Sequence, residues 1–376
     1  MTRQHSSHTS PVRALLLALL LNAPALHTPV LAAPAAPTPQ IGPSFQFGSA
    51  AFGEVARTSY QTVGQSGNFD DWIESAYQKS GVTLGTAGSL SADLDARAAA
   101  IRAATGDARV QLERSAASWA HRFVKKAIPK FSLERGFELA NVVRTGERQC
   151  LAQSFIISGL LQRAGMQAGA VMVWSNPEGK QSNLGHVVSV VRLSSGNGGS
   201  DLLVDASDPT PFVHHQGLLV KTAGGYRFVK PNYTATDTIS GYTVASSGAS
   251  GSGARLKVAD TAPLTLSYLH SQFDYYRGER ATGGILGTPV GKAPRGATPD
   301  GLKQSALYFS RALQEDPQNA LASFMLGHVL KRQGQIALAL AQYRRADALY
   351  LTQGHVPPGV GSAIAALSRP TKAGKS

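Results

Sequence analysis

The chain has only one cysteine, Cys150, among its 376 residues. Exported proteins with several cysteines usually pair them in disulfides, but one cysteine cannot form a bond within its own chain. The sequence therefore excludes a disulfide scaffold, and Cys150 is either a free thiol or paired with another molecule. It can serve as a small core residue or as a nucleophile.

Long apolar runs are also missing. No segment has the roughly 20 consecutive apolar residues that are needed to span a bilayer. The short run ALLLALLL at 14–21 follows a basic start with Arg3 and Arg13, and small residues such as Val30 and Ala32 come after it. This order is typical of a signal peptide cleaved after Ala32. We therefore expect a signal peptide over residues 1–32, an exported (periplasmic, cell-envelope or secreted) protein and no transmembrane segment, with an uncleaved anchor as the alternative.

Acidic residues are few compared with basic ones, 23 against 36, and the formal net charge is +13. Such an excess can favour anionic envelope polymers, membranes or nucleic acid. The basic residues are scattered, however, with no long Lys/Arg run and no interleaved aromatic stack. A solvated basic surface is the simpler interpretation, and the composition does not favour a nucleic-acid partner.

Helical patterns precede the cysteine and strand patterns follow it. Apolar residues recur at helical spacing in three runs, one capped at Ser91, then Val110–Ala127 and Leu133–Val143. Beyond Cys150 the apolar patterns predict strands, the last two of them a hairpin: Ala170–Trp174, His186–Leu193, Asp201–Asp205, Leu218–Lys221 and Tyr226–Val229. The chain is therefore predicted to be an α+β protein with an antiparallel sheet.

The position of Cys150 favours a reactive thiol. Thr145 and Gly146 are expected to supply a cap and a break, so that Cys150 falls in the first turn of its helix. Unpaired backbone N–H groups at a helix N-terminus stabilise a thiolate, and Arg148 adds positive charge nearby.

A nucleophilic thiol needs a base, and the base needs an orienting group. His186 is predicted to open a central strand and Asp205 to close the next one. The turn at residues 194–200 lets these strands pair as neighbours. Adjacent strands would bring the imidazole and the carboxylate within reach of each other, with the cysteine helix lying across them.

This stretch resembles the transglutaminase-like superfamily of papain-type cysteine enzymes over roughly residues 116–209. The family pattern has Cys, a small residue four later, a Leu-rich stretch with Arg, then Gly-apolar-x-Ala, and later His and Asp. The matching residues are Cys150, Ser154, Leu160, Leu161, Arg163, Gly165, Met166, Gln167, Ala168, His186 and Asp205. The family often has an aromatic residue soon after the His, where this chain has Val187 and Val188.

The resemblance implies a papain-like core and a catalytic triad of Cys150, His186 and Asp205. It implies an acyl-enzyme formed from an amide of a peptide or protein substrate, with hydrolysis and transamidation both open. No cofactor and no metal are expected. The alternative is a non-catalytic envelope protein that binds a protein or peptide partner.

Other polar residues near the triad have simpler interpretations. Gln149 can be considered as an oxyanion donor, but the backbone N–H of Cys150 is better placed. Asp208 belongs to a Ser-Asp-Pro turn. His214 and His215 suggest a metal site, but adjacent residues of an extended segment face opposite ways, and no Cys or acidic cluster accompanies them. Ser154 is expected to be a small packing residue, and Trp174 a core or groove residue.

The C-terminal part matches tetratricopeptide spacing. Leu326-Gly327, Ala339, Tyr343 and Ala346 fit one repeat, in which small residues let two helices approach closely. Phe309, Ala312 and Pro317 fit the end of a preceding repeat. One and a half repeats are too few for an independent stack, so we expect them to dock on the catalytic domain or on a helix at Leu264–Tyr276. Partner binding through these helices comes second, and a plain helical hairpin is the alternative.

These patterns divide the chain after the signal peptide into five parts. They are a leader of uncertain structure (33–90), a transglutaminase-like catalytic domain with N-terminal helices (91–245), a linker with one helix (246–301), tetratricopeptide-like helices (302–352) and a flexible tail (353–376).

Overall fold

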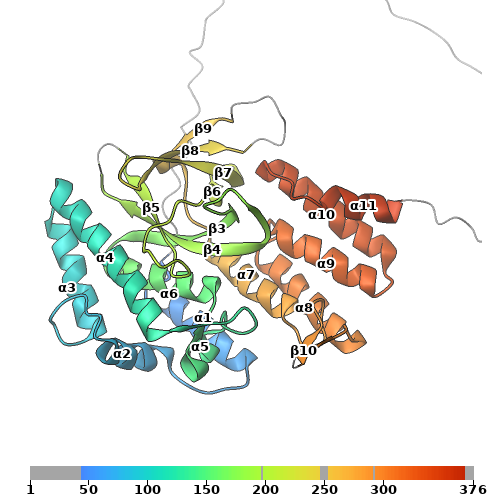
Figure 1. Cartoon of the computed structure of the whole chain (residues 1–376), viewed down its shortest axis with the longest axis horizontal. Helices are drawn as coiled ribbons and strands as arrows, with labels where there is room; N and C mark the ends of the chain where they lie inside the picture. Colours follow the sequence, from blue (N-terminus) through green and yellow to red (C-terminus); the bar gives the residue numbers. More distant parts are fainter. Residues whose placement is uncertain (1–43, 196–197, 246–252, 291–292, 369–376) are drawn as a thin grey trace, which may run out of the picture. The chain divides into compact units, whose positions relative to one another are not determined.

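The computed structural model describes residues 44–195, 198–245, 253–290 and 293–368. Helices and a large antiparallel sheet alternate in blocks along the chain, which confirms the predicted α+β class (Figure 1). The predicted signal peptide lies outside the described residues. None of the described helices combines the length and the apolar character that crossing a bilayer requires.

The main sheet has seven strands in the order β5-β4-β3-β6-β7-β8-β9, and all neighbours are antiparallel. β5 also pairs with β8 at Asp201 and Ile239, so six of the strands close on themselves. A small core of mostly β-branched residues fills the space between them. The strands are β3 (Gln167–Ser175), β4 (Gln181–Leu193), β5 (Ser200–Val204), β6 (Gly217–Thr222), β7 (Gly225–Tyr233), β8 (Ile239–Val244) and β9 (Arg255–Lys257).

The predicted strands are present, with one difference that matters for the site. β3, β4 and β5 pair as expected, for example through Val190 and Leu203, and the hairpin of β6 and β7 is confirmed. The prediction that His186 opens its strand is wrong, because β4 begins at Gln181 and pairs with β3 beyond His186. The predicted start directly follows Gly185, which has a φ of +67° and makes the strand irregular at this point.

The cysteine helix α6 (Cys150–Arg163) lies at the centre of the main core and is buried from Cys150 to Leu161. Ser154 of α6 forms two hydrogen bonds with β4, the strand that carries His186. The Ser154 hydroxyl donates to the Val187 carbonyl at 2.9 Å, and the Ser189 hydroxyl donates to the Ser154 carbonyl at 3.0 Å. These bonds fix the position of α6 along β4. Ser154 is thus a packing residue, as expected, and it also sets the register between helix and strand.

The segment that had no assignment from sequence is helical and belongs to the core. Residues before 90 form α1 (Ala50–Thr62) and α2 (Phe69–Ser80), and the rings of Phe45 and Phe52 stack on Phe155 of α6 at 4.9 Å. Three more helices, α3 (Leu90–Ala103), α4 (Gly106–Ala127) and α5 (Leu139–Thr145), lead to the cysteine. The cap of α3 is Ser89, which accepts from Ala92 N–H, and not Ser91.

The stretch expected to be a linker is largely built into the fold. β9 continues the main sheet, a short 3-10 turn (Val258–Asp260) follows, and α7 (Leu266–Glu279) is buried over most of its length. The short strands β10 (Thr288–Val290) and β11 (Ala293–Arg295) pair with each other. Residues 246–252 of the predicted Gly/Ser linker lie outside the described residues.

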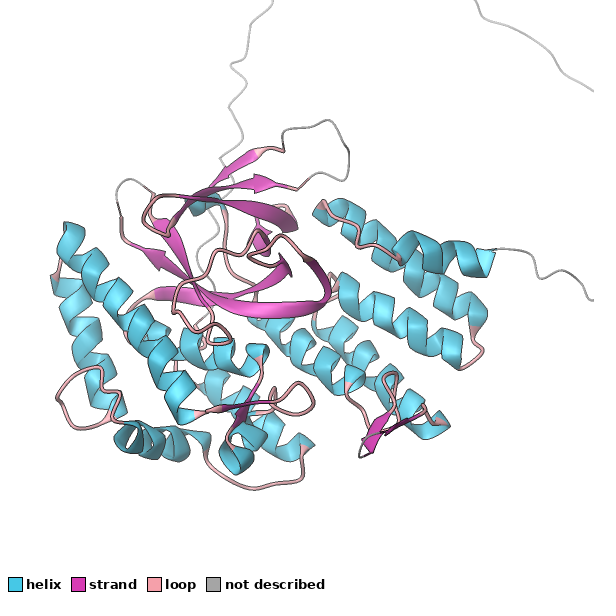
Figure 2. Cartoon of the chain, in the orientation of Figure 1, coloured by secondary structure: helices cyan, strands magenta, loops and turns pink. Residues whose placement is uncertain are grey.

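The C-terminal helices are α8 (Pro299–Glu315), α9 (Ala320–Arg332), α10 (Ile336–Gln353) and α11 (Val360–Ser368), so part of the predicted tail is helical (Figure 2). They contact the rest of the chain through buried hydrogen bonds. Asn319 Nδ2 donates to Ser271 Oγ of α7 at 2.9 Å, and the Tyr226 hydroxyl of β7 donates to Asp316 Oδ2 at 2.8 Å. These contacts agree with the expected intramolecular docking.

The close approach of α9 and α10 gives a direct test of the tetratricopeptide spacing. A Cβ at Gly327 would lie 2.6 Å from the ring of Tyr343, whereas a Cβ at Gly53 of α1 would meet no atom within 4 Å. Both glycines lie in helices, where alanine is intrinsically favoured by up to about 1 kcal/mol. We expect Gly327→Ala to lower the melting temperature by a few degrees, because the helices must separate, and Gly53→Ala to leave it unchanged or raise it. Equal melting temperatures for the two variants would contradict the close helix contact.

Candidate active site

Cys150 is the first residue of α6, as its position in the sequence suggested, but the cap differs from the expected one. Gln149 is the N-cap, and its side-chain oxygen accepts from Leu151 N–H at 3.4 Å. Thr145 and Gly146 end α5 instead, and the two-residue strand β2 (Glu147–Arg148) lies between the helices, paired with β1 (Lys130–Phe131). The backbone N–H of Cys150 has no acceptor among the described residues. The amide oxygen of Gln149 caps the helix, and the unpaired N–H of Cys150 is a candidate oxyanion donor at the thiol itself.

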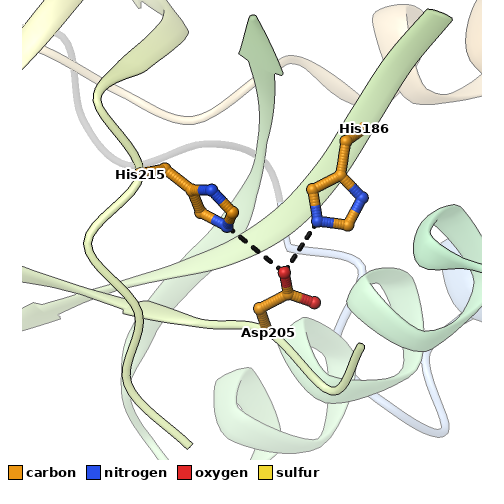
Figure 3. Close-up of side chains that lie close together, drawn as sticks. All are labelled: His186, Asp205 and His215. Atoms are coloured by element: carbon orange, nitrogen blue, oxygen red, sulfur yellow. Dashed lines mark hydrogen bonds and ion pairs between the residues drawn. The ribbon is translucent and has the colours of Figure 1, made fainter. Parts of the chain in front are cut away.

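His186 and Asp205 are in direct contact, and His215 joins them (Figure 3). His186 Nε2 lies 2.7 Å from Asp205 Oδ2, and His215 Nε2 lies 3.2 Å from the same oxygen. A carboxylate only accepts hydrogen bonds, so both imidazoles must carry their proton on Nε2 in these contacts. Asp205 directly follows β5, and its neighbour strand β4 carries His186.

The carboxylate of Asp205 accepts four hydrogen bonds. Its second oxygen, Oδ1, accepts from Gln153 Nε2 at 3.2 Å and from the backbone N–H of Ser207 at 2.8 Å. Burial by itself raises the pKa of Asp205, but the hydrogen bonds from His186, His215 and Ser207 and the charge of His186 bring it far below its usual value of 3.8. The group therefore stays ionised and holds both imidazoles in place.

Arg148 supports the acid and not the thiol. Its guanidinium donates to Gln153 Oε1 at 3.1 Å and to the Ala206 carbonyl at 3.2 Å, and its charge acts on Asp205. Because Gln153 in turn donates to Asp205, Arg148 orients a donor of the carboxylate. Sequence reasoning placed the charge of Arg148 near the thiol, and the hydrogen bonds described here connect it to the groups around Asp205.

The thiol of Cys150 is only 5% exposed, and its Sγ lies 3.5 Å from the hydroxyl oxygen of Tyr276. His186 and the backbone of Val187 are the other groups close enough to act on the pKa of the thiol. Since Nε2 of His186 is bound to Asp205, the ring nitrogen that faces sulfur is Nδ1. Burial raises the pKa of the thiol, but the hydrogen bond and charge of His186, with Tyr276 and Val187, lower it below its usual value of 9.0.

His186 shows the opposite shift. Burial lowers its pKa, while the hydrogen bonds and charges of Asp205 and Cys150 raise it, to about 10. A thiol whose pKa is lowered, beside an imidazole whose pKa is raised, favours transfer of the proton from sulfur to nitrogen. The site can therefore hold a thiolate–imidazolium pair near neutral pH.

These shifts predict how stability depends on pH. The lowered pKa of Asp205 means that its contribution is present above about pH 4 and is lost as the pH falls. The raised pKa of His186 means that its contribution is complete below pH 6.5 and is lost as the pH rises through about 10. Both are complete only between about pH 4 and 6.5.

We expect the difference in unfolding free energy between the wild type and His186→Ala to be largest in that window and to shrink on its alkaline side. Urea denaturation of both proteins at a series of pH values measures it. A difference that stays constant from pH 5 to pH 10 would contradict the assignment of a raised pKa to His186.

His215 was missed from the site by sequence reasoning, although His214 and His215 were considered together. The two side chains do face different ways: His214 lies 3.0 Å from Asp237, and His215 is buried against Asp205.

Ligand atoms of His186, Asp205 and His215 lie within 4.8 Å of one another, a spacing that could accommodate a metal ion. Asp205 Oδ2 already accepts from both imidazoles, however, and the distances are those of hydrogen bonds. The absence of a metal remains a prediction.

The remaining candidates have structural roles. Asp208 accepts from the backbone and hydroxyl of Thr210, as a turn residue does. Trp174 is buried, donates to the Leu218 carbonyl and stacks on His355 with ring centroids 4.3 Å apart. It also lines a small, mostly apolar cavity of about 30 Å³, which reaches Gly185, the residue before His186 on β4.

Comparison of the chain with protein-family models, with curated proteins and with solved structures gave no match. The function proposed below therefore rests on the residues and geometry of the site.

Proposed function

We propose that this chain is an exported cysteine enzyme with a papain-like, transglutaminase-like core, which cleaves or transfers amide bonds of a peptide or protein substrate. The observation that carries the proposal is the His186–Asp205 contact at 2.7 Å, next to a buried thiol whose pKa His186 lowers. Cys150 opens a buried helix packed on the antiparallel sheet, His186 lies on strand β4 of that sheet, and Asp205 follows its neighbour β5, which supports the proposal. The packing of that helix against β3 and β4 supports the papain-like assignment.

The geometry supplies each group that acyl transfer needs. The Cys150 thiolate attacks the carbonyl carbon of the amide, and the charge that develops on oxygen is met by the free N–H of Cys150. His186 then gives its Nδ1 proton to the leaving amine, so that the C–N bond breaks and a thioester remains on Cys150. Asp205 holds the imidazole during both steps.

The second half of the reaction decides between hydrolysis and transfer. Water or an amine attacks the thioester, His186 takes the proton of the attacking group, and the thiolate leaves. His186 has 27% of its side chain exposed, whereas Cys150 is almost covered. The incoming acceptor is therefore expected to reach the thioester from the imidazole side.

Trapping the acyl-enzyme tests the proposal. A mixture of peptides is incubated with the protein and hydroxylamine, which attacks a thioester to give an acyl hydroxamate and free thiol. Hydroxamates, together with a mass adduct on Cys150 when hydroxylamine is left out, are the expected results. If neither forms and Cys150 is also unreactive toward an alkylating agent, the protein is not a thiol enzyme, and the alternative of a partner-binding envelope protein takes its place.

A further inference from the structure

Tyr276 of α7 lies against the thiol, although it comes from a segment outside the residues that resemble the family. Its hydroxyl oxygen is 3.5 Å from Cys150 Sγ, and it donates to the Gly185 carbonyl at 2.6 Å. Gly185 directly precedes the candidate base, His186. The single hydroxyl proton of Tyr276 can therefore go either to Cys150 Sγ or to the Gly185 carbonyl, on the strand that carries His186.

The surroundings of Tyr276 fix the hydroxyl in place. Its ring stacks on Phe137 with centroids 5.6 Å apart and meets Tyr275 edge-on at 5.3 Å. One residue later, Arg277 forms a buried ion pair with Glu138, at 2.7 Å between Nε and Oε1. α7 is therefore anchored to the segment that leads into α5, and the phenol cannot move away from sulfur without breaking buried contacts.

The phenol is a donor and not an acid at physiological pH. Burial raises the pKa of Tyr276 well above its usual value of 10.0, and the charges of Cys150 and Glu279 add to that shift. The ionisable groups nearest the thiol are His186 from β4, Tyr276 from α7 and, beyond His186, Asp205. Because hydrogen bonds to charged groups are stronger than those between neutral groups, a thiolate competes well with the Gly185 carbonyl for the hydroxyl proton.

A second donor lies near Gly185. Gln272 lies one turn before Tyr276 on α7 and is fully buried, and its Nε2 has no partner among the described residues. That nitrogen is 3.4 Å from the position that a Cβ on Gly185 would take. Gln272 is therefore an unpaired amide donor close to the same stretch of backbone.

We propose that Tyr276 is a further catalytic residue, whose hydroxyl bonds to Gly185 when the thiol is neutral and turns to sulfur to stabilise the Cys150 thiolate. The proposal rests on the proposed function of Cys150 as the nucleophile. α7 thereby takes a direct part in setting the fraction of Cys150 that is thiolate. The sequence alone predicted α7 only as a helix within a linker.

The test is the pH dependence of Cys150 alkylation by iodoacetamide, measured by intact mass for the full chain. We expect Tyr276→Phe to raise the midpoint of the profile by about one pH unit, which is roughly a tenfold loss of rate at mildly acidic pH. Tyr275→Phe is the matched control, because its hydroxyl is equally buried but bonds to Glu279 at 3.0 Å. The control should leave the midpoint unchanged.

A second variant covers the case in which Tyr276→Phe does not fold. Replacing Tyr276 by 3,5-difluorotyrosine keeps the ring but makes the hydroxyl a stronger donor, so the midpoint should move down. Midpoints that stay at the wild-type value in folded variants would overturn the role of Tyr276. That outcome is distinct from failure of the proposed function, which would appear as a wild-type midpoint at or above that of an ordinary thiol.

Discussion

Replacing Cys150 by alanine should reduce turnover of an amide substrate by at least about 10⁴-fold while leaving the protein folded. The loss is large because the thiolate is the atom that forms the acyl-enzyme, and the other members of the triad cannot substitute for it. The change in volume is small, and Asp205 keeps its four donors. The measurements are kcat/KM for the variant and its melting temperature.

Ser158→Ala is a matched control for this experiment. Ser158 lies on the same buried helix, and its hydroxyl donates to Ser189 Oγ at 3.2 Å, away from the triad. We expect this variant to lose some stability and to keep its turnover. If Cys150→Ala retained wild-type turnover, the thiol would not be the nucleophile.

The second large effect is expected at His186. His186→Ala removes both the proton acceptor and the positive charge that favours the thiolate, so the loss of turnover should be comparable to that of Cys150→Ala. The two losses should not add in the double variant, because the residues act as one unit. Additive losses would mean that Cys150 and His186 act in separate processes.

Asp205→Asn is expected to cost less, and some activity should remain. Cys150 and His186 still face each other in this variant, and the Cys150 N–H still meets the oxyanion. The amide nitrogen of Asn must, however, face one pair of donors, either the two imidazoles or Gln153 and Ser207. We therefore expect a lower melting temperature in addition to the partial loss of turnover.

The parts of the site that follow from local pattern could be predicted from the sequence. An apolar run that begins with Cys150 predicted α6, and two apolar runs joined by a short turn predicted the pairing of β4 with β5. Asp205 lies one residue after β5, close to its predicted place. The prediction for His186 was wrong because Gly185 lies inside β4 with a positive φ, whereas a glycine in the sequence usually indicates the end of a strand.

The parts that depend on distant contacts could not be predicted in this way. His215 and Tyr276 lie 65 and 126 positions from Cys150 in numbering, and their own segments give no sign of what they contact. α1 and α2 escaped assignment because serines and other polar residues, with a glycine in α1, weaken the helical pattern, while stacking of Phe45 and Phe52 on Phe155 holds α1 in the core. The adjacent pair His214–His215 was the available signal for His215, since one of two neighbours on an extended segment must face inward.

The thiolate–imidazolium pair is the central claim, and the alkylation rate of wild-type Cys150 as a function of pH tests it most directly. Burial alone would raise the pKa of this thiol above its usual value of 9.0, so only the contacts with His186, Tyr276 and Val187 can lower it. The midpoint of the profile is independent of the absolute rate, which the 5% exposure of the thiol will reduce. We expect a midpoint clearly below 9.0 in the wild type and an upward shift in His186→Ala. A wild-type midpoint at or above 9.0, unchanged in His186→Ala, would show that Cys150 is a buried core residue and would contradict the proposed function.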